Sequence, residues 1–308
     1  MRALVVSNMR ADPTHPGRGS FVRDQVAALR ELEGVDVELF EFPPGVRELA
    51  GAAREGRRRG RFDVVHAHYG LTAWPALAVR ARLRALTVHG SDLRIARTRH
   101  ATAVVLPAIG LLAATSAELA AQLPTSRARA RARILPCGVD TGRFAPLERR
   151  AARERIGLAV DRPLLLFPAD RSRPEKRFDL AERVALACGA ELVALGATPP
   201  AELPLWINAA NAVLVPSERE GFGLAVLEAL ACDVPVLATP VGEHAAALAG
   251  VEGCLCAPFD ADRWAGVARV HLAAEDPRVA GRAAAERYSA KVMAGRVLGA
   301  WREALGSV

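Results

Sequence analysis

Lysine is nearly absent from this chain of 308 residues: only Lys176 and Lys291 stand among 41 basic residues, and the others are arginine. A bias of this kind usually reflects genomic composition. The formal net charge of +7 is therefore only weak evidence for a nucleic-acid ligand, and we expect no nucleic-acid partner. The bias also draws attention to Lys176, because a chain that otherwise uses arginine places a compact ammonium there.

Cysteine is scarce as well, with five residues in the chain. Their spacing matches neither the paired ligands of a zinc site nor the dense pattern of a secreted disulfide scaffold. We expect reduced thiols, a cytoplasmic location and no bound metal. The cysteines are Cys137, Cys188, Cys232, Cys254 and Cys256.

Long apolar runs are missing too. The longest, from about Ala101 to Thr115, is interrupted by Pro107 and Gly110 and is shorter than the roughly 20 residues of a membrane-spanning helix. The chain opens on a strand pattern, without the apolar stretch of a secretory signal. A peripheral contact with anionic lipid at the inner face of the membrane stays open, since one segment is dense in arginine. A solvated helix face is the favoured interpretation of that segment, which holds Arg54, Arg57, Arg58, Arg59 and Arg61.

Several catalytic signatures are also lacking. The sequence holds neither the G-x-G-x-x-G pattern of dinucleotide sites nor the G-x-x-x-x-G-K-[ST] pattern of P-loop nucleotide sites. It has no G-x-S-x-G elbow and no H-E-x-x-H helix, so neither a serine hydrolase nor a zinc protease is supported.

What is present is a repeated alternation of short apolar runs with longer, alanine-rich amphipathic segments. This alternation is typical of α/β proteins whose parallel sheets are covered by helices. We predict two doubly wound, Rossmann-like domains that face each other across a cleft. The predicted boundaries are residues 1–145 for the first domain, 146–160 for a linker, 161–289 for the second domain and 290–308 for a last helix.

The strongest local signal surrounds a glycine-flanked helix start. Gly221 and Gly223 allow close approach of the backbone to a ligand, and the helix expected to begin near Leu224 offers free N–H groups to a phosphate. Glu228 lies just over one turn into that helix and suits a ribose diol, while Glu220 in the preceding loop suits a second polyol. A ligand with two sugars joined by a diphosphate fits this arrangement.

A second cluster of charge follows the first strand of the second half, where Arg171 and Lys176 could neutralise a diphosphate. The alternative, that both are ordinary surface charges, is less attractive beside the Glu220 to Glu228 segment. The alternating run Arg127, Arg129, Arg131 and Arg133 is interpreted as a surface loop.

In the first half, Gly17 and Gly19 lie in a loop before a helix expected near Phe21, where a phosphate or an acceptor could bind. His66, His68 and His89 fall at predicted strand ends. A metal site at His66 and His68 would need a third ligand and is not favoured. We expect His66 to be packed, and His89 to be the better functional candidate.

Taken in order, these segments resemble the retaining glycosyltransferases of family 4, which have the two-domain GT-B fold. The resemblance covers nearly the whole chain and implies that the last helix, 290–308, packs back on the first domain. The Gly17 to Gly19 loop is similar to the family's N-terminal glycine loop. Further matches are Thr87-Val-His-Gly-Ser-Asp-Leu93, Ile134-Leu-Pro-Cys-Gly-Val-Asp-Thr-Gly-Arg-Phe144, the Arg171 and Lys176 pair, and the E-x7-E pair of Glu220 and Glu228. Within the family, the chain is similar to bacterial cell-envelope enzymes, including teichuronic-acid-type transferases.

The resemblance implies metal-independent transfer of a sugar from a nucleoside-diphosphate sugar, with retention, to a glycan, a lipid-linked or a small-molecule acceptor, and no cofactor. Arg171, Lys176 and the amides near Leu224 would stabilise the leaving diphosphate, with Gly221, Phe222 and Gly223 in the same donor site. Glu220 would orient the donor sugar and Glu228 the ribose. His89 would face the sugar from the first domain, and the glycine loop would lie near the acceptor. A front-face mechanism follows, because no side chain is an evident nucleophile.

Two departures from the family pattern stand out: Cys137 replaces the usual Asn, and Arg177 follows Lys176 where glycine is common. The stretch between Leu186 and Leu203, which normally helps to hold the base, is short. Two other functions on the same architecture stay open, a nucleotide-sugar epimerase or hydrolase and a non-catalytic nucleotide-sugar-binding protein.

Overall fold

The computed structural model describes residues 1–196 and 198–306. The chain forms two compact units. The first contains Met1–Pro13, Arg18–Gly138 and the segment from Ala290 onward, and the second contains Val139–Ser289 together with Thr14–Gly17. Within the second unit, next to the chain crossings at Gly138/Val139 and Ser289/Ala290, the Val139 N–H donates to the carbonyl of Tyr288 over 2.9 Å.

The first unit is built on a six-stranded sheet in the order β2-β1-β3-β4-β5-β6, in which every recorded pairing is parallel. Because β2 lies on one side of β1 and β3 on the other, the strand order reverses between β1 and β3. Ligands of such sheets bind beside the carboxyl ends of the strands at this reversal. The strands are β1 (Arg2–Ser7), β2 (Asp36–Glu41), β3 (Arg61–His68), β4 (Arg80–Val88), β5 (Leu111–Ala114) and β6 (Arg133–Ile134).

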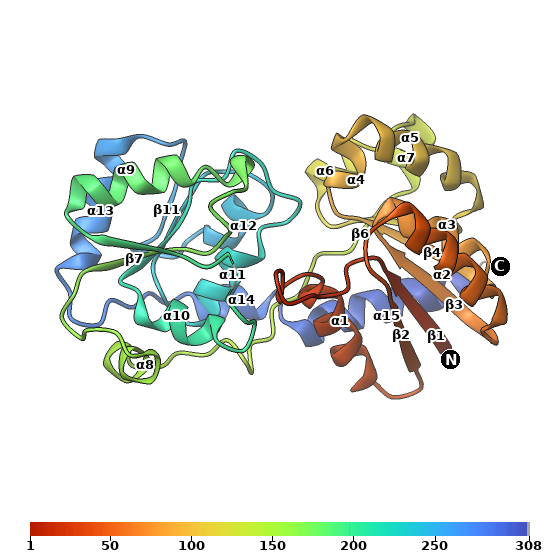
Figure 1. Ribbon diagram of the computed structural model, residues 1–308, viewed down its shortest axis with the longest axis horizontal. Helices are drawn as coiled ribbons and strands as arrows, with labels where there is room; N and C mark the ends of the chain where they lie inside the picture. Colours follow the sequence, from red (N-terminus) through yellow and green to blue (C-terminus); the bar gives the residue numbers. More distant parts are fainter. Residues whose placement is uncertain (197, 307–308) are drawn as a thin grey trace. The chain divides into compact units, whose positions relative to one another are not determined.

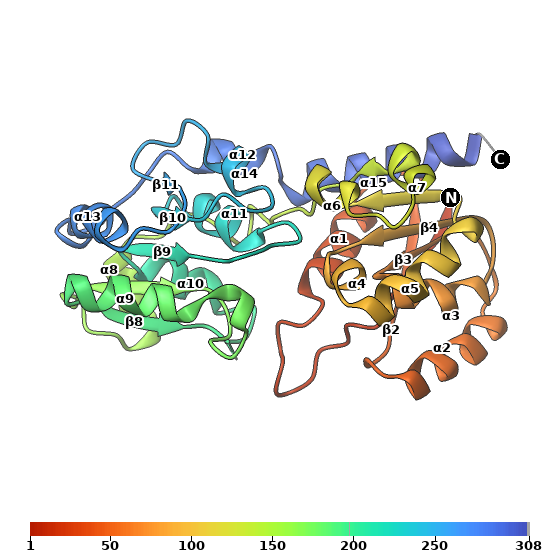
Figure 2. The same cartoon turned by 90° about the horizontal axis from the view of Figure 1, so that it is seen from above.

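Helices cover both faces of this sheet (Figure 2). On one face α1 (Ser20–Arg30) packs beside α15 (Ala290–Gly306), and their apolar side chains join those of β1 and β3 in one core cluster. On the other face lie α2 (Val46–Arg58), α3 (Ala73–Leu77) and α5 (Ala96–Val105), over a second cluster. The shorter elements are η1 (Gly70–Thr72), α4 (Ser91–Arg94), η2 (Leu106–Ala108), α6 (Ala117–Ala121) and α7 (Ser126–Arg131).

The second unit has a five-stranded sheet in the order β11-β10-β9-β7-β8, again with parallel pairings. Here the order reverses between β7 and β9. Both strands are buried along their whole length, as the apolar runs LLLF and AVLV require of strands covered on two faces. The strands are β7 (Leu164–Phe167), β8 (Glu191–Ala194), β9 (Ala212–Val215), β10 (Val236–Ala238) and β11 (Leu255–Cys256).

Figure 1 shows α9 (Phe178–Cys188) and α13 (Ala261–Leu272) on one side of this sheet, where Trp264 is fully buried. Helices α8 (Arg149–Ile156) and α10 (Leu203–Ala209) pack together on the other side, as do α11 (Leu224–Ala231) and α14 (Arg282–Glu286). Two short elements complete the unit, η3 (Pro174–Lys176) and α12 (His244–Leu248). The α/β class and the two parallel-sheet domains predicted from the sequence are confirmed.

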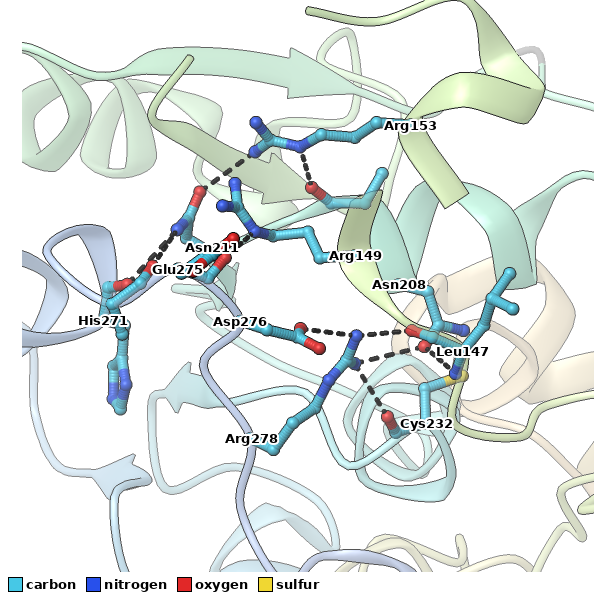
Figure 3. Close-up of polar contacts among 12 residues, drawn as sticks. Leu147, Arg149, Arg153, Asn208, Asn211, Cys232, His271, Glu275, Asp276 and Arg278 are labelled. Carbon is cyan, nitrogen blue, oxygen red and sulfur yellow. Dashed lines mark hydrogen bonds and ion pairs between the residues drawn. The ribbon is translucent and has the colours of Figure 1, made fainter. Parts of the chain in front are cut away.

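The range 146–160, predicted as a linker, is instead part of the second unit. It holds α8, and the Arg153 side chain of that helix is fully buried. Its guanidinium donates to the carbonyls of Ala209, Val160 and Arg162 and to Asn211 Oδ1, over 2.6–3.1 Å. Figure 3 shows this contact beside those of Arg149 and Arg278. The polar residues of this range suggested a linker, but Arg153 among them donates hydrogen bonds to backbone carbonyls inside the second unit.

The predicted surface loop at Arg127 to Arg133 is also corrected. Residues Ser126–Arg131 form α7, whose N-terminus is capped by Thr125 Oγ1. Arg131 donates to the carbonyls of Leu106 and Ile109, both over 2.6 Å. The alternating arginines and alanines thus form a helix, and the Arg131 side chain attaches that helix to the backbone of residues 106–109.

Helix α15 comes last in the described chain but belongs to the first unit. Met293, Val297 and Trp301 on its buried face join the core over β1 and β3. The Trp301 indole donates from Nε1 to His66 Nδ1 over 3.1 Å. None of the helices in the described parts of the chain has the length and apolarity needed to cross a membrane.

Candidate active site

In the second unit, two loops meet where the strand order reverses. One follows β7 and carries Lys176, and the other follows β9 and carries Ser217 and Glu220. Lys176 Nζ lies 2.6 Å from Glu220 Oε1 and 2.8 Å from Oε2, and the Ser217 hydroxyl donates to Oε1 over 2.7 Å. The side chains of Lys176 and Glu220 are only 15% and 10% exposed. The structure thus joins two of the predicted residues in one nearly buried ion pair.

The charge state of Glu220 follows from this contact. Burial raises the pKa of the carboxyl, but Lys176 and the Ser217 hydroxyl favour the ionised form more strongly, so that the net pKa lies below the ordinary value. Glu220 is therefore a carboxylate at neutral pH. It is suited to accepting hydrogen bonds and poorly suited to donating a proton.

Beside this pair begins α11, which starts at Leu224 as predicted. Its N-cap, Gly223, has φ +109° and no side chain of its own that could cap the helix. Glycine is required at this position because of the positive φ and because an added Cβ would lie 2.4 Å from His244 Nε2. His244 is fully buried and its Nδ1 lies 2.8 Å from the carbonyl of Thr239. Its Nε2 is buried with no hydrogen-bond partner in the described part of the chain.

The remaining donor-site candidates, Gly221, Phe222 and Glu228, differ in burial. Phe222 is 5% exposed, and its ring packs against Tyr288 at 5.8 Å between centroids, so only its backbone is available to a ligand. Gly221 is half-buried in the same loop, and Glu228 is half-buried on α11.

Arg171 is exposed, and the structure gives its guanidinium no hydrogen-bond or ion-pair partner among the described residues. It lines a hollow of about 350 Å³ in the second unit. Phe178, Leu192 and Ala194 form part of the lining. A cation without a partner at the rim of a hollow is free to meet an anionic group.

The unusual arginine after Lys176 now has a structural explanation. Arg177 adopts φ +56° and ψ +54°, the left-handed region that favours glycine. Its guanidinium bonds both carboxylate oxygens of Asp179, over 2.9 and 2.8 Å. Arg177 thus occupies a glycine-type backbone position.

In the first unit, His89 follows β4 and is half-buried, and the Phe21 ring lies 4.9 Å from its own. The segment that carries it is held by Asp92, which is fully buried. The Asp92 carboxylate accepts from the backbone N–H groups of His89, Gly90 and Gly70 over 2.7–3.2 Å. Burial raises the pKa of Asp92 to about 6, although these amides oppose the shift.

His66 and His68 at the end of β3 are both 1% exposed and stack at 4.8 Å. His66 is packed as expected, between Trp301 and the Thr87 hydroxyl. His68 bonds Gln25 and His89. In the described part of the chain, no group of three or more His, Cys, Asp or Glu side chains is arranged to hold a metal ion.

The two loop glycines differ. Gly19 is the N-cap of α1 with φ +70°, and an added Cβ would lie 2.4 Å from the carbonyl oxygen of Met9. Gly17 has no such φ, and an added Cβ would meet nothing within 4 Å. Only Gly19 is required by the backbone.

Sequence reasoning missed four residues: Ser217, His244, Gln25 and Asp92 as a backbone anchor. Ser217 and His244 each follow the end of a strand, which was the available signal. Gln25 carried no signal, because it lies inside an ordinary amphipathic helix.

Two family models match this chain. The family model described as Glycosyltransferase Family 4 matches residues 5–143, and the one described as Glycosyl transferases group 1 matches residues 170–273. The chain is 31% identical to the D-inositol 3-phosphate glycosyltransferase of Mycolicibacterium paratuberculosis, over 85% of this chain and 70% of the relative. It is 31% identical to the protein of the same name from Thermobispora bispora, over 96% of this chain and 82% of the relative.

Solved structures show the same fold. A sucrose-phosphate synthase from Thermosynechococcus elongatus superposes with a TM-score of 0.74 at 18% identity, over 100% of both chains. The Anabaena protein HepE in complex with UDP and glucose gives a TM-score of 0.70 at 17% identity, also over 100% of both chains. The resemblance to family 4 and the GT-B fold are confirmed. The likeness to teichuronic-acid-type transferases stays a prediction.

Proposed function

Because this chain belongs to glycosyltransferase family 4, we propose that it transfers a sugar from a nucleoside-diphosphate sugar to an acceptor hydroxyl, with retention of configuration and without a metal ion. The observation that carries the proposal is the Lys176–Glu220 ion pair, which lies between the carboxyl ends of β7 and β9 beside the uncapped start of α11. It places a cation, an anion and a helix N-terminus within one unit.

The leaving group determines what such a site must do. As the bond from the anomeric carbon to the phosphate oxygen breaks, its electron pair stays on the diphosphate, whose negative charge rises. Lys176, Arg171 and the first amides of α11 are the groups that would stabilise this charge. The stabilisation is strongest in the transition state, which is the requirement for catalysis.

Glu220 is assigned to orientation rather than to proton transfer. A carboxylate held ionised by Lys176 and Ser217 accepts hydrogen bonds from sugar hydroxyls and is a weak base. The acceptor's proton would then pass to the leaving phosphate as the acceptor oxygen forms its new bond on the same face of the sugar. Glu228, one turn into α11, is assigned to the ribose diol.

The proposed acceptor follows from the names of the relatives and from a helix end in the first unit. The relatives named D-inositol 3-phosphate glycosyltransferase make an inositol phosphate the first acceptor to test, beside a glycan and a lipid-linked sugar. The uncapped α1 N-terminus at Gly19 is the region that we assign to the acceptor. The exposed arginines of α2 leave contact with anionic lipid as a further prediction.

Binding of the donor is tested by isothermal titration of the purified protein with UDP, GDP, ADP, TDP and inorganic pyrophosphate. Lys176→Ala should weaken pyrophosphate and the preferred nucleoside diphosphate alike, by about tenfold or more, since one charge-assisted contact is worth about 1.5–3 kcal/mol. Glu228→Gln should weaken only the nucleoside diphosphate. Lys291→Ala is the matched control, because Lys291 is the other lysine and is exposed on α15.

Lys176→Ala leaves a nearly buried Glu220 without its cation, which can lower stability. The paired change Lys176→Met with Glu220→Gln avoids this and should weaken the diphosphate just as much. Retention and metal independence are tested by NMR of the product's anomeric proton, with and without EDTA. Consumption of the donor without an acceptor would favour the epimerase or hydrolase alternative, and binding without turnover of any donor would favour the non-catalytic one.

A further inference from the structure

Three histidine rings form a row in the first unit, at the carboxyl ends of β3 and β4. The rings of His66 and His68 are 4.8 Å apart with 27° between their planes, and those of His68 and His89 are 5.2 Å apart with 25°. Gln25 reaches the middle ring from α1. The resemblance to family 4 assigns His89 to the donor sugar, whereas Gln25 and His68 have no role yet.

The hydrogen bonds in this row have a direction. Gln25 Nε2 lies 3.1 Å from His68 Nε2, and His68 Nδ1 lies 3.0 Å from His89 Nε2. An amide nitrogen only donates, so His68 Nε2 must accept. A neutral imidazole has a single N–H, which then lies on His68 Nδ1 and donates to His89 Nε2. His89 is left with its own proton on Nδ1.

A single N–H on each ring requires that the rings be neutral, and their surroundings keep them so. Burial lowers the pKa of His66 and His89 to about 3 each and holds the pKa of His68 well below its ordinary value. His66 is fixed separately, because Trp301 donates to its Nδ1 and its Nε2 meets the Thr87 hydroxyl at 2.7 Å. Neighbouring rings on β3 thus carry their protons on opposite nitrogens.

We propose that Gln25 and His68 are positioning residues that fix His89 in the tautomer with its proton on Nδ1, so that His89 presents an N–H donor to the donor sugar. The inference rests on the proposed function in that last clause. A histidine in water favours the proton on Nε2, and a ring in that tautomer would offer the sugar a lone pair instead of a donor. The chain of hydrogen bonds from Gln25 through His68 to His89, here called the relay, selects which His89 nitrogen is the donor. Asp92 fixes the backbone of His89.

The tautomers can be read directly by NMR. Two-bond ¹H–¹⁵N correlation spectra of protein labelled with ¹⁵N-histidine distinguish protonated from bare nitrogens in each of the seven histidines. His68→Asn and His89→Asn assign the two signals. The wild-type protein is expected to show the proton on Nδ1 of both rings. A proton on Nε2 of His89 in the wild-type protein would overturn the inference.

Gln25→Met, similar in volume but without a donor, should shift His89 toward the Nε2–H tautomer and lower kcat about tenfold, with little change in donor KM. The loss should be constant across neutral pH, because no group in the row titrates there. His66→Asn is the matched control, since it changes a neighbouring buried ring outside the relay and should leave the His89 tautomer unchanged. A His89 spectrum that is unaffected by Gln25→Met would refute the role of Gln25.

The spectra need no substrate. If the protein transfers no sugar from any donor, the proposed function fails while the tautomer measurement still decides whether the relay exists. If Gln25→Met does not fold, the wild-type spectrum alone decides the proton positions.

Discussion

Acidification should destabilise the first unit through His66, His68 and His89. A histidine whose folded pKa is depressed contributes stability above its unfolded pKa of about 6.5, and this stability is lost as the pH falls toward the folded value. For His66 and His89, with folded pKa values of about 3, the loss by about pH 5 is about 2 kcal/mol each, since 1.5 pH units correspond to about 2 kcal/mol. His68 acts in the same direction.

Asp92 opposes this loss. Its folded pKa of about 6 is raised above the ordinary value of 3.8, so its contribution is present at low pH and is lost as the pH rises through about 6. Lowering the pH from about 7.5 to about 5 therefore adds about 1 kcal/mol to the free energy of unfolding through Asp92. The sum for His66, His89 and Asp92 is a destabilisation of about 3 kcal/mol, to which His68 adds.

The measurement is hydrogen exchange of the β3 and β4 amides at both pH values, corrected for the intrinsic rates, because it reports on the first unit alone. His66→Asn keeps an acceptor for Trp301 and removes one titrating ring, so it should reduce the pH dependence by about 2 kcal/mol. Equal pH dependence in the wild-type protein and His66→Asn would show that His66 is not a buried neutral ring and would refute the reasoning.

Three further changes test the backbone and the buried cation. Arg153→Met should destabilise the second unit by about 3 kcal/mol or more in urea unfolding, because several buried carbonyls lose their donor; a loss below about 1 kcal/mol would contradict this. Arg177→Gly should raise stability by about 0.5–1 kcal/mol by relieving a left-handed residue, whereas Arg177→Ala should give no gain. Gly19→Ala should lower the melting temperature through its contact with Met9, and Gly17→Ala, its matched control, should leave it unchanged.

Much of the fold was predictable because buried parallel strands are short apolar runs. The apolar runs Leu164-Leu-Leu-Phe167 and Ala212-Val-Leu-Val215 coincide residue for residue with β7 and β9. The start of β4 does not show in this way, because Arg80, Arg82 and Arg84 alternate along it and the stretch free of arginine begins only at Ala85, five residues after the strand does. Helices α7 and α8 were missed for a related cause: their arginines donate to backbone carbonyls, and composition does not distinguish such cations from solvated ones.

In the candidate site, too, some residues were predictable from the sequence and others were not. Lys176 and Glu220 stood out because of a rare residue type and flanking glycines, and the structure brings them into one ion pair. Gln25 and Asp92 could not be selected in this way. The role of Gln25 depends on a contact with a residue 43 positions away, and that of Asp92 depends on which backbone amides the fold directs at it.

The place of α15 in the chain has a consequence for biosynthesis. The first unit's strands and α1 leave the ribosome early, but the helix that covers β1 and β3 follows only after the roughly 150 residues of the second unit, about 8–30 s later at ordinary translation rates. During that interval one face of the nascent sheet lacks Met293, Val297 and Trp301, and His66 has no indole donor. The core of the first unit is therefore completed only after the second unit has been made. Chaperones that bind apolar surface have that interval in which to act.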